Sequence, residues 1–348
     1  MKRLYTTQEY KFRNSIKIAK SHRSKRNKKY SFYKFKEKFN RPRNFLITVY
    51  APSDFRTIDN PHECLLCFRQ MRDFENINKI ARKSFIEFSM EFINEIDYAT
   101  ISILTSISDD LKFKKINVRG TFPKNPKCLK LLMESGFLSH IVGKNNRKFP
   151  KLASSDLIFF EKGVGVLTDK ENKKISYLIK NVMNHLTGIQ KYCLPIKTII
   201  LEICGNSIEW SGTQNRQWLL GVQYDSEKVT FTVTDVGKGI LSTLHRKFGI
   251  LLKDVFTGKT DSSILAGAFD QKYGSSTQEV NRNKGLPAVK TRLRDGSIKS
   301  LKVITNNVIL DFDDPQKTKT FEKGSPRFKG TFYQWEMTKE CIHNLNAL

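Results

Sequence analysis

The sequence predicts an α/β protein with two domains behind a basic N-terminal arm. Three observations support this prediction. Residues 44–150 alternate strand and helix patterns, residues 151–348 combine hairpin-like strand patterns with amphipathic helices, and 16 of the 61 Lys and Arg residues lie within residues 1–43. A chain of 348 residues is also long enough to bury two cores of ordinary size.

The arm, residues 1–43, contains 2 acidic residues against 16 basic ones, in a chain whose net charge is +27. Aromatic side chains from Tyr30 to Phe39 are interleaved with its cations. Because cations attract phosphates and rings stack on bases, this composition predicts binding to nucleic acid. Two alternatives stay open: a tail that is disordered or docks on an acidic partner, and a Lys-rich composition that reflects the base composition of the gene.

The first α/β domain, residues 44–150, contains three predicted strands and three predicted helices. The strands are expected at 45–50, 84–90 and 115–118, and the helices at 64–71, 98–111 and 127–135. Cys64 and Cys67 form a C-x-x-C motif that can supply two zinc ligands. Since no second pair follows at similar spacing, the favoured interpretation is one buried helical face with reduced thiols.

The second domain, residues 151–348, has the patterns of one mostly antiparallel sheet covered on one face by helices. Its strands are expected at 217–224, 228–234, 301–310 and 331–337, and its helices at 168–187, 194–211 and 286–295. Thr168 and Glu171 form a capping box that predicts the start of the first of these helices.

Glu202 and Asn206 are the first pair of residues in this domain with chemical potential. They are four positions apart in a predicted helix, so their side chains share one face. A carboxylate and a carboxamide placed in this way can hold a hydrated Mg²⁺ ion and orient a nucleophile against a terminal phosphate.

Three glycine-containing segments follow this pair. Asp235 ends a predicted strand, where its carboxylate can accept a hydrogen bond from an exocyclic amine, and Gly237 and Gly239 let the backbone pass close to a ligand. Gly285 ends a basic loop that opens a helix, an arrangement suited to phosphate. Thr331, after Lys329 and Gly330, begins the predicted closing strand.

These motifs, in this order, resemble the GHKL superfamily of ATP-binding domains, which includes gyrase, MutL, histidine kinases and anti-sigma-factor serine kinases. The resemblance covers about residues 159–337. It implies an α+β two-layer sandwich of the Bergerat type, a mixed and mostly antiparallel sheet, and ATP with Mg²⁺ as cofactors. In such a domain Asn206 would be a Mg²⁺ ligand and Glu202 the general base or a water-orienting carboxylate. Asp235 would recognise adenine, and Gly237 and Gly239 would shape the pocket wall. Gly285 would belong to the second glycine box, and Gly330 with Thr331 to the third.

Residues 240–284 would form the ATP lid of such a domain. Its candidate phosphate-facing side chains are Lys272, Ser275, Ser276, Arg282 and Lys284. A solvated polar loop accounts for each of these equally well. Asn283 stands where the second glycine box usually carries its first glycine, which affects the expected phosphate contact there.

Residues 44–145 resemble a STAS-type domain in their pattern of strands and helices. STAS domains of anti-anti-sigma factors are phosphorylated by GHKL kinases on a serine just after an aspartate. Here Asp97 is followed at the matching position by Ala99, which has no hydroxyl group. The resemblance therefore implies an internal scaffold or docking unit, with Thr100 or Ser102 as acceptors only in a shifted geometry.

We expect a Mg·ATP-binding switch or ATPase in a regulatory or defence complex. Two alternatives remain: a serine/threonine kinase of the anti-sigma type, and a nucleic-acid or protein adaptor that holds a nucleotide only for structure. No apolar run of eighteen residues and no secretion signal occur, so we expect a soluble cytoplasmic protein without a membrane partner. Partner proteins, nucleic acid through residues 1–43 and self-association are the expected interactions.

Overall fold

The structure is a mixed α/β fold whose described residues form a seven-stranded, a three-stranded and a short two-stranded β-sheet. It is a computed structural model that describes residues 45–77, 84–140, 158–165, 167–210, 217–247, 258–270, 285–322 and 324–347. Residues 44–348 form one compact unit by themselves. The predicted arm and the candidate lid residues Lys272, Ser275, Ser276, Arg282 and Lys284 lie outside the described residues.

The three-stranded sheet is parallel, in the order β1-β3-β5, and β2 pairs with β4 in the two-stranded sheet. Parallel neighbours need crossover connections, and helices supply them here. The elements of this part are β1 Phe45–Tyr50, β2 Asp54–Phe55, α2 Pro61–Ile77, β3 Ser84–Ser89, β4 Glu95–Ile96, α3 Tyr98–Phe113, β5 Ile116–Thr121, α4 Pro126–Glu134 and the 3₁₀ helix η2 Phe137–His140. The alternation of strands and helices predicted for this part is confirmed in the described residues up to 140, although α2 begins three residues before Cys64 and extends past Phe74.

The larger sheet has seven strands, in the order β11-β10-β9-β12-β8-β7-β6, and its paired strands are antiparallel. The strands are β6 Ile158–Val164, β7 Gln217–Tyr224, β8 Lys228–Asp235, β9 Lys299–Asn306, β10 Val308–Asp311, β11 Lys319–Thr320 and β12 Phe328–Thr338. The predicted antiparallel-rich sheet is therefore confirmed. The sequence patterns did not reveal β6 or β11.

One predicted strand, residues 301–310, is wrong as a single element. The chain reverses after β9 and pairs Val308 with Thr305, so the segment is the hairpin of β9 and β10. Asn306 has a φ of +54°, in the left-handed region that asparagine tolerates better than most residues. The hydrophobic run continues on both sides of the turn, which is why its pattern resembles one strand.

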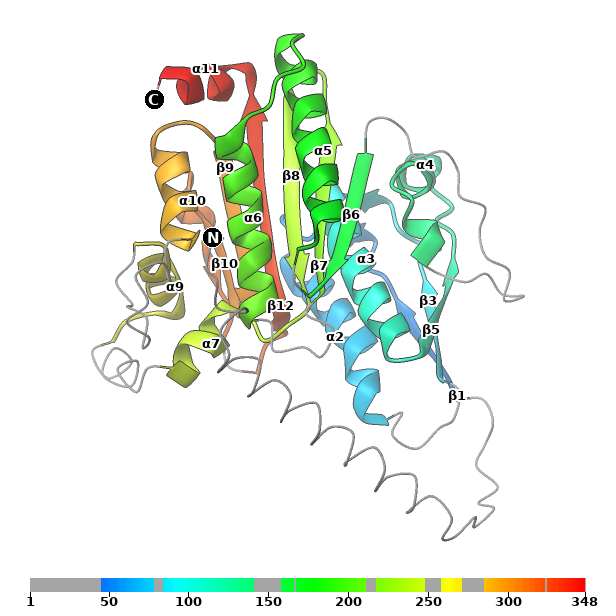
Figure 1. Cartoon of the computed structure of the whole chain (residues 1–348). Helices are drawn as coiled ribbons and strands as arrows, with labels where there is room; N and C mark the ends of the chain where they lie inside the picture. The colour runs from blue at the N-terminus through cyan, green and yellow to red at the C-terminus, as the bar shows by residue number, and fades with distance from the viewer. Residues whose placement is uncertain are drawn as a thin grey trace, which may run out of the picture. The chain divides into compact units, whose positions relative to one another are not determined.

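Helices α5, α6 and α10 lie across one face of the larger sheet (Figure 1). The helices of this half are α5 Asp169–Thr187, α6 Leu194–Trp210, α7 Ile240–Lys247, α9 Asp261–Phe269, α10 Gly285–Arg294 and α11 Lys339–Ala347, with the 3₁₀ helix η3 Pro315–Lys317. The predicted capping box is present, since Thr168 accepts a hydrogen bond from the Glu171 amide and Glu171 accepts one from the Thr168 amide.

Helix α3 packs against β5 on one side and against β7 and β8 on the other, so it lies between the three-stranded and the seven-stranded sheet. Every residue from Tyr98 to Leu111 is buried. Strand β8 alternates accordingly: Phe231 and Val233 face the core under α5 and α6, while the Thr232 and Thr234 hydroxyls meet Ser102 of α3.

The second hydrophobic core combines side chains from both halves of the chain. Ile304, Phe328 and Phe332 of the larger sheet cluster with the buried residues of α2 and α3. Cys64 and Cys67 of α2 are buried in this core, as predicted, and burial raises the pKa of the Cys67 thiol to about 12. The C-x-x-C motif therefore belongs to a packed helical face.

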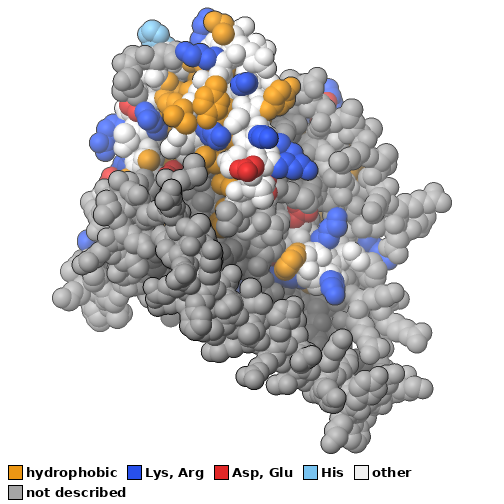
Figure 2. Space-filling view, viewed as in Figure 1, with side chains coloured by type: hydrophobic (Ala, Val, Ile, Leu, Met, Phe, Trp, Pro, Cys, Tyr) orange, Lys and Arg blue, Asp and Glu red, His pale blue; other side chains and the backbone are white. Residues whose placement is uncertain are grey.

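The surface of α5 and α6 combines cations with exposed hydrophobic side chains. Figure 2 shows hydrophobic side chains gathered among Lys and Arg on the described part of one face. Tyr177, Ile189, Tyr192 and Leu194 are exposed, and Lys197 Nζ lies 5.8 Å from the centroid of the Tyr192 ring. None of the helices in the described part of the chain has the length and hydropathy of a membrane span.

Candidate functional site

Asp235, the last residue of β8, is the centre of the candidate site. Only 5% of it is exposed, and it faces three donors. The Gly237 amide donates to Oδ1 over 2.9 Å, the Ser207 hydroxyl lies 3.3 Å from Oδ2, and Thr331, its partner in the β8–β12 pairing, also donates. Burial raises the pKa of Asp235 to about 6, although the hydrogen bonds oppose this rise.

The loop after Asp235 is held by the turn between β9 and β10. Thr305 Oγ1 accepts a hydrogen bond from the Ile240 amide (2.9 Å) at the start of α7, and Asn306 Nδ2 donates to the Lys238 carbonyl (2.9 Å). Gly239 has a φ of +81°, and a Cβ atom there would lie 2.5 Å from Asn306 Oδ1. Gly239 is therefore packed against the side chains of the β9–β10 turn, and its closeness to a ligand stays a prediction.

Gly330 brings the start of β12 against the end of β8. Its φ is +152°, and a Cβ atom at this position would lie only 2.1 Å from the carbonyl oxygen of Asp235. Thr305 Oγ1 donates to the Gly330 carbonyl over 2.9 Å. The third glycine segment thus forms one wall beside Asp235, and it places Thr331 where it can donate to the carboxylate.

Glu202 and Asn206 of α6 meet the N-terminus of α10. A Cβ atom on Gly285, the first residue of α10, would lie 3.0 Å from Asn206 Nδ2 and 3.1 Å from Glu202 Oε2. Glu202 is exposed and Asn206 is half-buried. The amides of a first helical turn have no partners within the helix and carry partial positive charge, so this corner favours an anionic group.

These two clusters belong to one site because Ser207 follows Asn206 on α6 and reaches Asp235. The structure therefore brings together Glu202, Asn206 and Gly285 on one side, and Asp235, Gly237, Gly239 and Thr331 on the other. Ser275, Ser276, Arg282 and Lys284 lie outside the described residues.

Asn206 provides a test of whether the site fits a metal-bound ligand. Its Nδ2 atom is buried and has no hydrogen-bond partner among the described residues. A buried amide without a partner is costly, and rotation of the amide would present its carbonyl oxygen instead. Across the described ranges, no group of three or more His, Cys, Asp or Glu side chains could hold a metal ion. The donor set therefore fits Mg²⁺ only as an ion that shares its coordination with phosphate and water.

The stretch from Asp97 to Ser102 forms the beginning of α3 and is not accessible. Asp97 caps the helix by accepting a hydrogen bond from the Thr100 amide (2.7 Å). Thr100 Oγ1 lies 2.7 Å from Thr57 Oγ1, Ser102 Oγ lies 2.9 Å from Thr234 Oγ1, and Ala99 is buried. Neither hydroxyl can meet a phosphate donor unless α3 leaves the core.

Three residues that contribute to the site are not predicted from the sequence. Ser207 lies inside the helical motif, but its role depends on facing β8. Thr305 and Asn306 come from a segment whose hydrophobic pattern hides the turn, and only the Asn306-Asn307 pair in the sequence suggested one. Because these contacts join segments far apart in the chain, spacing alone does not reveal them.

No family model, curated protein or solved structure matches this chain.

Proposed function

We propose that the protein binds Mg·ATP beside α6 and α10 and acts as an ATP-dependent switch of the GHKL type. The observation that supports this proposal best is the meeting of four separate motifs around one corner of the larger sheet. Asp235 is reached by Ser207, Gly237 and Thr331, while Gly285 lies against Glu202 and Asn206. Such convergence is what a nucleotide site requires, and isolated turns would not produce it.

The proposed roles follow from the chemistry of each group. Asp235, fixed at a strand end by three donors, would accept a hydrogen bond from the adenine amino group. Asn206 would offer its amide oxygen to the metal, and Glu202, exposed on the same helical face, would orient a water molecule. When bound, Mg²⁺ neutralises charge on the phosphate oxygens. The N-terminus of α10 would favour phosphate beside Glu202 and Asn206.

Phosphate would go to water or to a protein outside this chain. Thr100 and Ser102 are buried in hydrogen bonds under the opposite face of the sheet, so an internal acceptor on α3 is not supported. A serine/threonine kinase acting on a separate partner is the second candidate. An adaptor with a structural nucleotide, and with nucleic acid bound through residues 1–43, is the third.

Two measurements on the purified full-length chain test the proposal. Calorimetric titration with Mg·ATP and Mg·GTP should show a preference for ATP, because guanine presents a carbonyl oxygen where adenine presents an amino group. ADP release should then fall at least about a hundredfold in Glu202→Ala, a typical loss for a base or water-orienting group. Thr198→Ala is the matched control, since Thr198 is exposed one turn earlier on α6.

Each outcome has a definite meaning. Absence of ATP binding at millimolar concentration would refute the proposed function. Binding without ADP release, even with nucleic acid added, would favour the kinase or the structural nucleotide. Equal turnover in Glu202→Ala and Thr198→Ala would remove Glu202 from the chemistry.

A further inference from the structure

Arg72, near the end of α2, connects the first half of the chain to the candidate site. Its guanidinium group donates to two backbone carbonyls: Nη2 reaches the Val236 oxygen over 2.8 Å, and Nη1 reaches the Lys329 oxygen. Val236 follows Asp235, and Lys329 precedes Gly330. One side chain therefore joins the two segments that meet at the Asp235 carboxylate.

The geometry of this contact needs arginine. A guanidinium group is planar and presents several N–H donors in a fixed fork, so it can span two carbonyls that diverge from one another. Lysine has a single ammonium group on a flexible stem and cannot reproduce the fork. Hydrogen bonds from a charged donor are also stronger than those between neutral groups.

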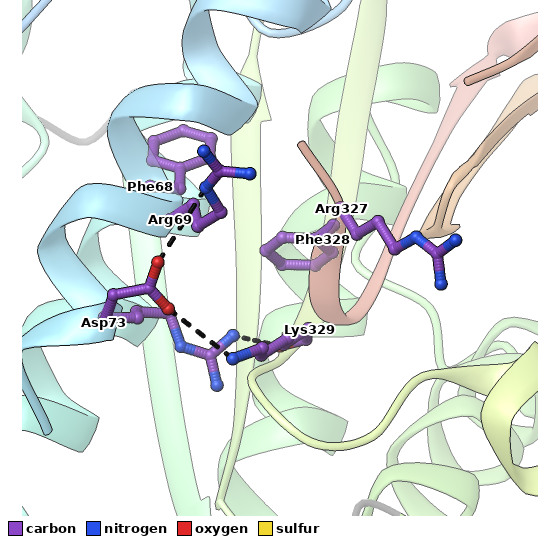
Figure 3. A pocket seen from close by; sticks show the side chains of 7 residues that line it. Phe68, Arg69, Asp73, Arg327, Phe328 and Lys329 are labelled. Atoms are coloured by element: carbon purple, nitrogen blue, oxygen red, sulfur yellow. Dashed lines mark hydrogen bonds and ion pairs between the residues drawn. The ribbon is translucent and has the colours of Figure 1, made fainter. Parts of the chain in front are cut away.

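The surroundings of Arg72 keep this contact in place. Figure 3 shows a pocket between α2 and the start of β12, lined by Phe68, Arg69, Asp73, Arg327, Phe328 and Lys329 together with Arg72. Phe68 and Phe328 are each 1% exposed and belong to the same core. Asp73 Oδ1 lies 3.6 Å from Lys329 Nζ, and Asp73 Oδ2 lies 3.8 Å from Arg69 Nε. The ion pair with Lys329 joins α2 to β12 a second time.

Gly330 and Arg72 act on the same two segments in different ways. The missing side chain of Gly330 permits the close approach of β12 to Asp235 and Val236, with which any Cβ atom would collide. Arg72 then holds these two segments together through hydrogen bonds to the carbonyls of Val236 and Lys329. The β9–β10 turn fixes the far end of the same loop through Lys238 and Ile240.

We propose that Arg72 is a positioning residue that holds the loop after Asp235 in its binding conformation, so that α2 is an integral part of the nucleotide site. This inference rests on the proposed function for its ligand. The effect of Arg72 on the loop depends on its two hydrogen bonds and is tested without nucleotide.

The experiment compares Arg72→Ala, Arg72→Lys and the control Arg69→Ala in the full-length chain. Arg69 lines the same pocket and forms an ion pair with Asp73 on the helix surface. Mg·ATP affinity should fall about tenfold to a hundredfold in Arg72→Ala, the usual range for losing hydrogen bonds to a charged group, and less in Arg72→Lys. Arg69→Ala should bind ATP as the unmodified chain does.

Amide hydrogen exchange of the nucleotide-free proteins supplies the second readout. Exchange in residues 236–239 should be faster in Arg72→Ala, including at Gly237, whose amide donates to Asp235. Residues 217–224 of β7 serve as the internal reference, because general destabilisation would accelerate both segments equally. If the unmodified chain binds no ATP, the proposed function fails, while the exchange result still decides the role of Arg72. Unchanged exchange in residues 236–239, or equal acceleration in both segments, would overturn the inference.

Discussion

Replacing Asp235 with asparagine should make the folded protein more stable and the site inactive. The carboxylate is 5% exposed, and burial raises its pKa from 3.8 to about 6. Each pKa unit corresponds to about 1.4 kcal/mol, so keeping this group charged above pH 6 costs the folded state about 3 kcal/mol. An asparagine can still accept from Gly237 and removes the buried charge.

The free energy of unfolding should depend on pH, because the folded and unfolded states bind different numbers of protons at Asp235. Between about pH 4 and pH 6 the folded protein binds a proton at Asp235 that the unfolded chain has lost, so stability falls as the pH rises through this range. The stability of Asp235→Asn lacks this component. The difference between the two proteins should therefore be near zero below pH 4, grow to about 1 to 3 kcal/mol in favour of the variant by pH 6.5, and stay constant above that.

Urea denaturation followed by circular dichroism at several pH values measures this difference. Asp311→Asn is the matched control, because Asp311 is also buried at a strand end. Burial alone would raise the pKa of Asp311, but hydrogen bonds from Lys302 and from backbone amides lower it below the usual value. That variant should lose stability at neutral pH. If Asp235→Asn is destabilised at pH 7.5, or if its difference from the unmodified chain does not vary with pH, the assignment of a destabilising buried charge to Asp235 is wrong. Calorimetry on the same samples should show that Asp235→Asn no longer binds ATP.

Three further predictions concern the walls of the site. In thermal melts, Gly330→Ala should reduce the free energy of unfolding by about 2 to 4 kcal/mol, because its backbone is left-handed and the new Cβ atom would collide with Asp235. Gly205→Ala is the control: a Cβ atom on Gly205 in α6 meets open space, so this variant should be neutral or more stable by up to about 1 kcal/mol. Gly285→Val should weaken Mg·ATP binding more than it lowers the melting temperature, since the new side chain would press on Glu202 and Asn206; equal losses in both would indicate a purely structural glycine. ATP affinity should decline as the pH falls through about 6, because protonation of Asp235 removes an acceptor, and a flat profile from pH 7.5 to 5 would contradict the adenine role.

The sequence predicted the parts of this fold that local chemistry determines. The Thr168 capping box, the strand that ends at Asp235 and the helix that begins at Gly285 all depend on residues within one or two turns of each other. Because each of these features begins or ends a helix or strand, the sequence also indicates where the neighbouring residues lie. These elements carry most of the candidate ligand contacts.

Other features depend on contacts across the fold and were hidden from the sequence. The spacing of Ile101, Leu104, Ile107 and Leu111 predicts a helix, but only the structure shows that α3 is buried on all sides. Its small hydroxyl side chains permit this, because Ser102 meets Thr232 and Thr234 where a larger polar residue would need water. Likewise, Arg72 resembles an ordinary surface cation until its two carbonyl partners are known.

The position of α3 between the sheets has a practical consequence for dissecting the chain. If residues 158–347 were expressed alone, Thr232, Thr234 and Phe332 would lose their cover and face water as an open sheet surface. The complementary fragment would expose the Ser and Ile side chains of α3 in the same way. We therefore expect each fragment to aggregate when produced by itself and the two to recover solubility when produced together, much as the halves of a split protein do.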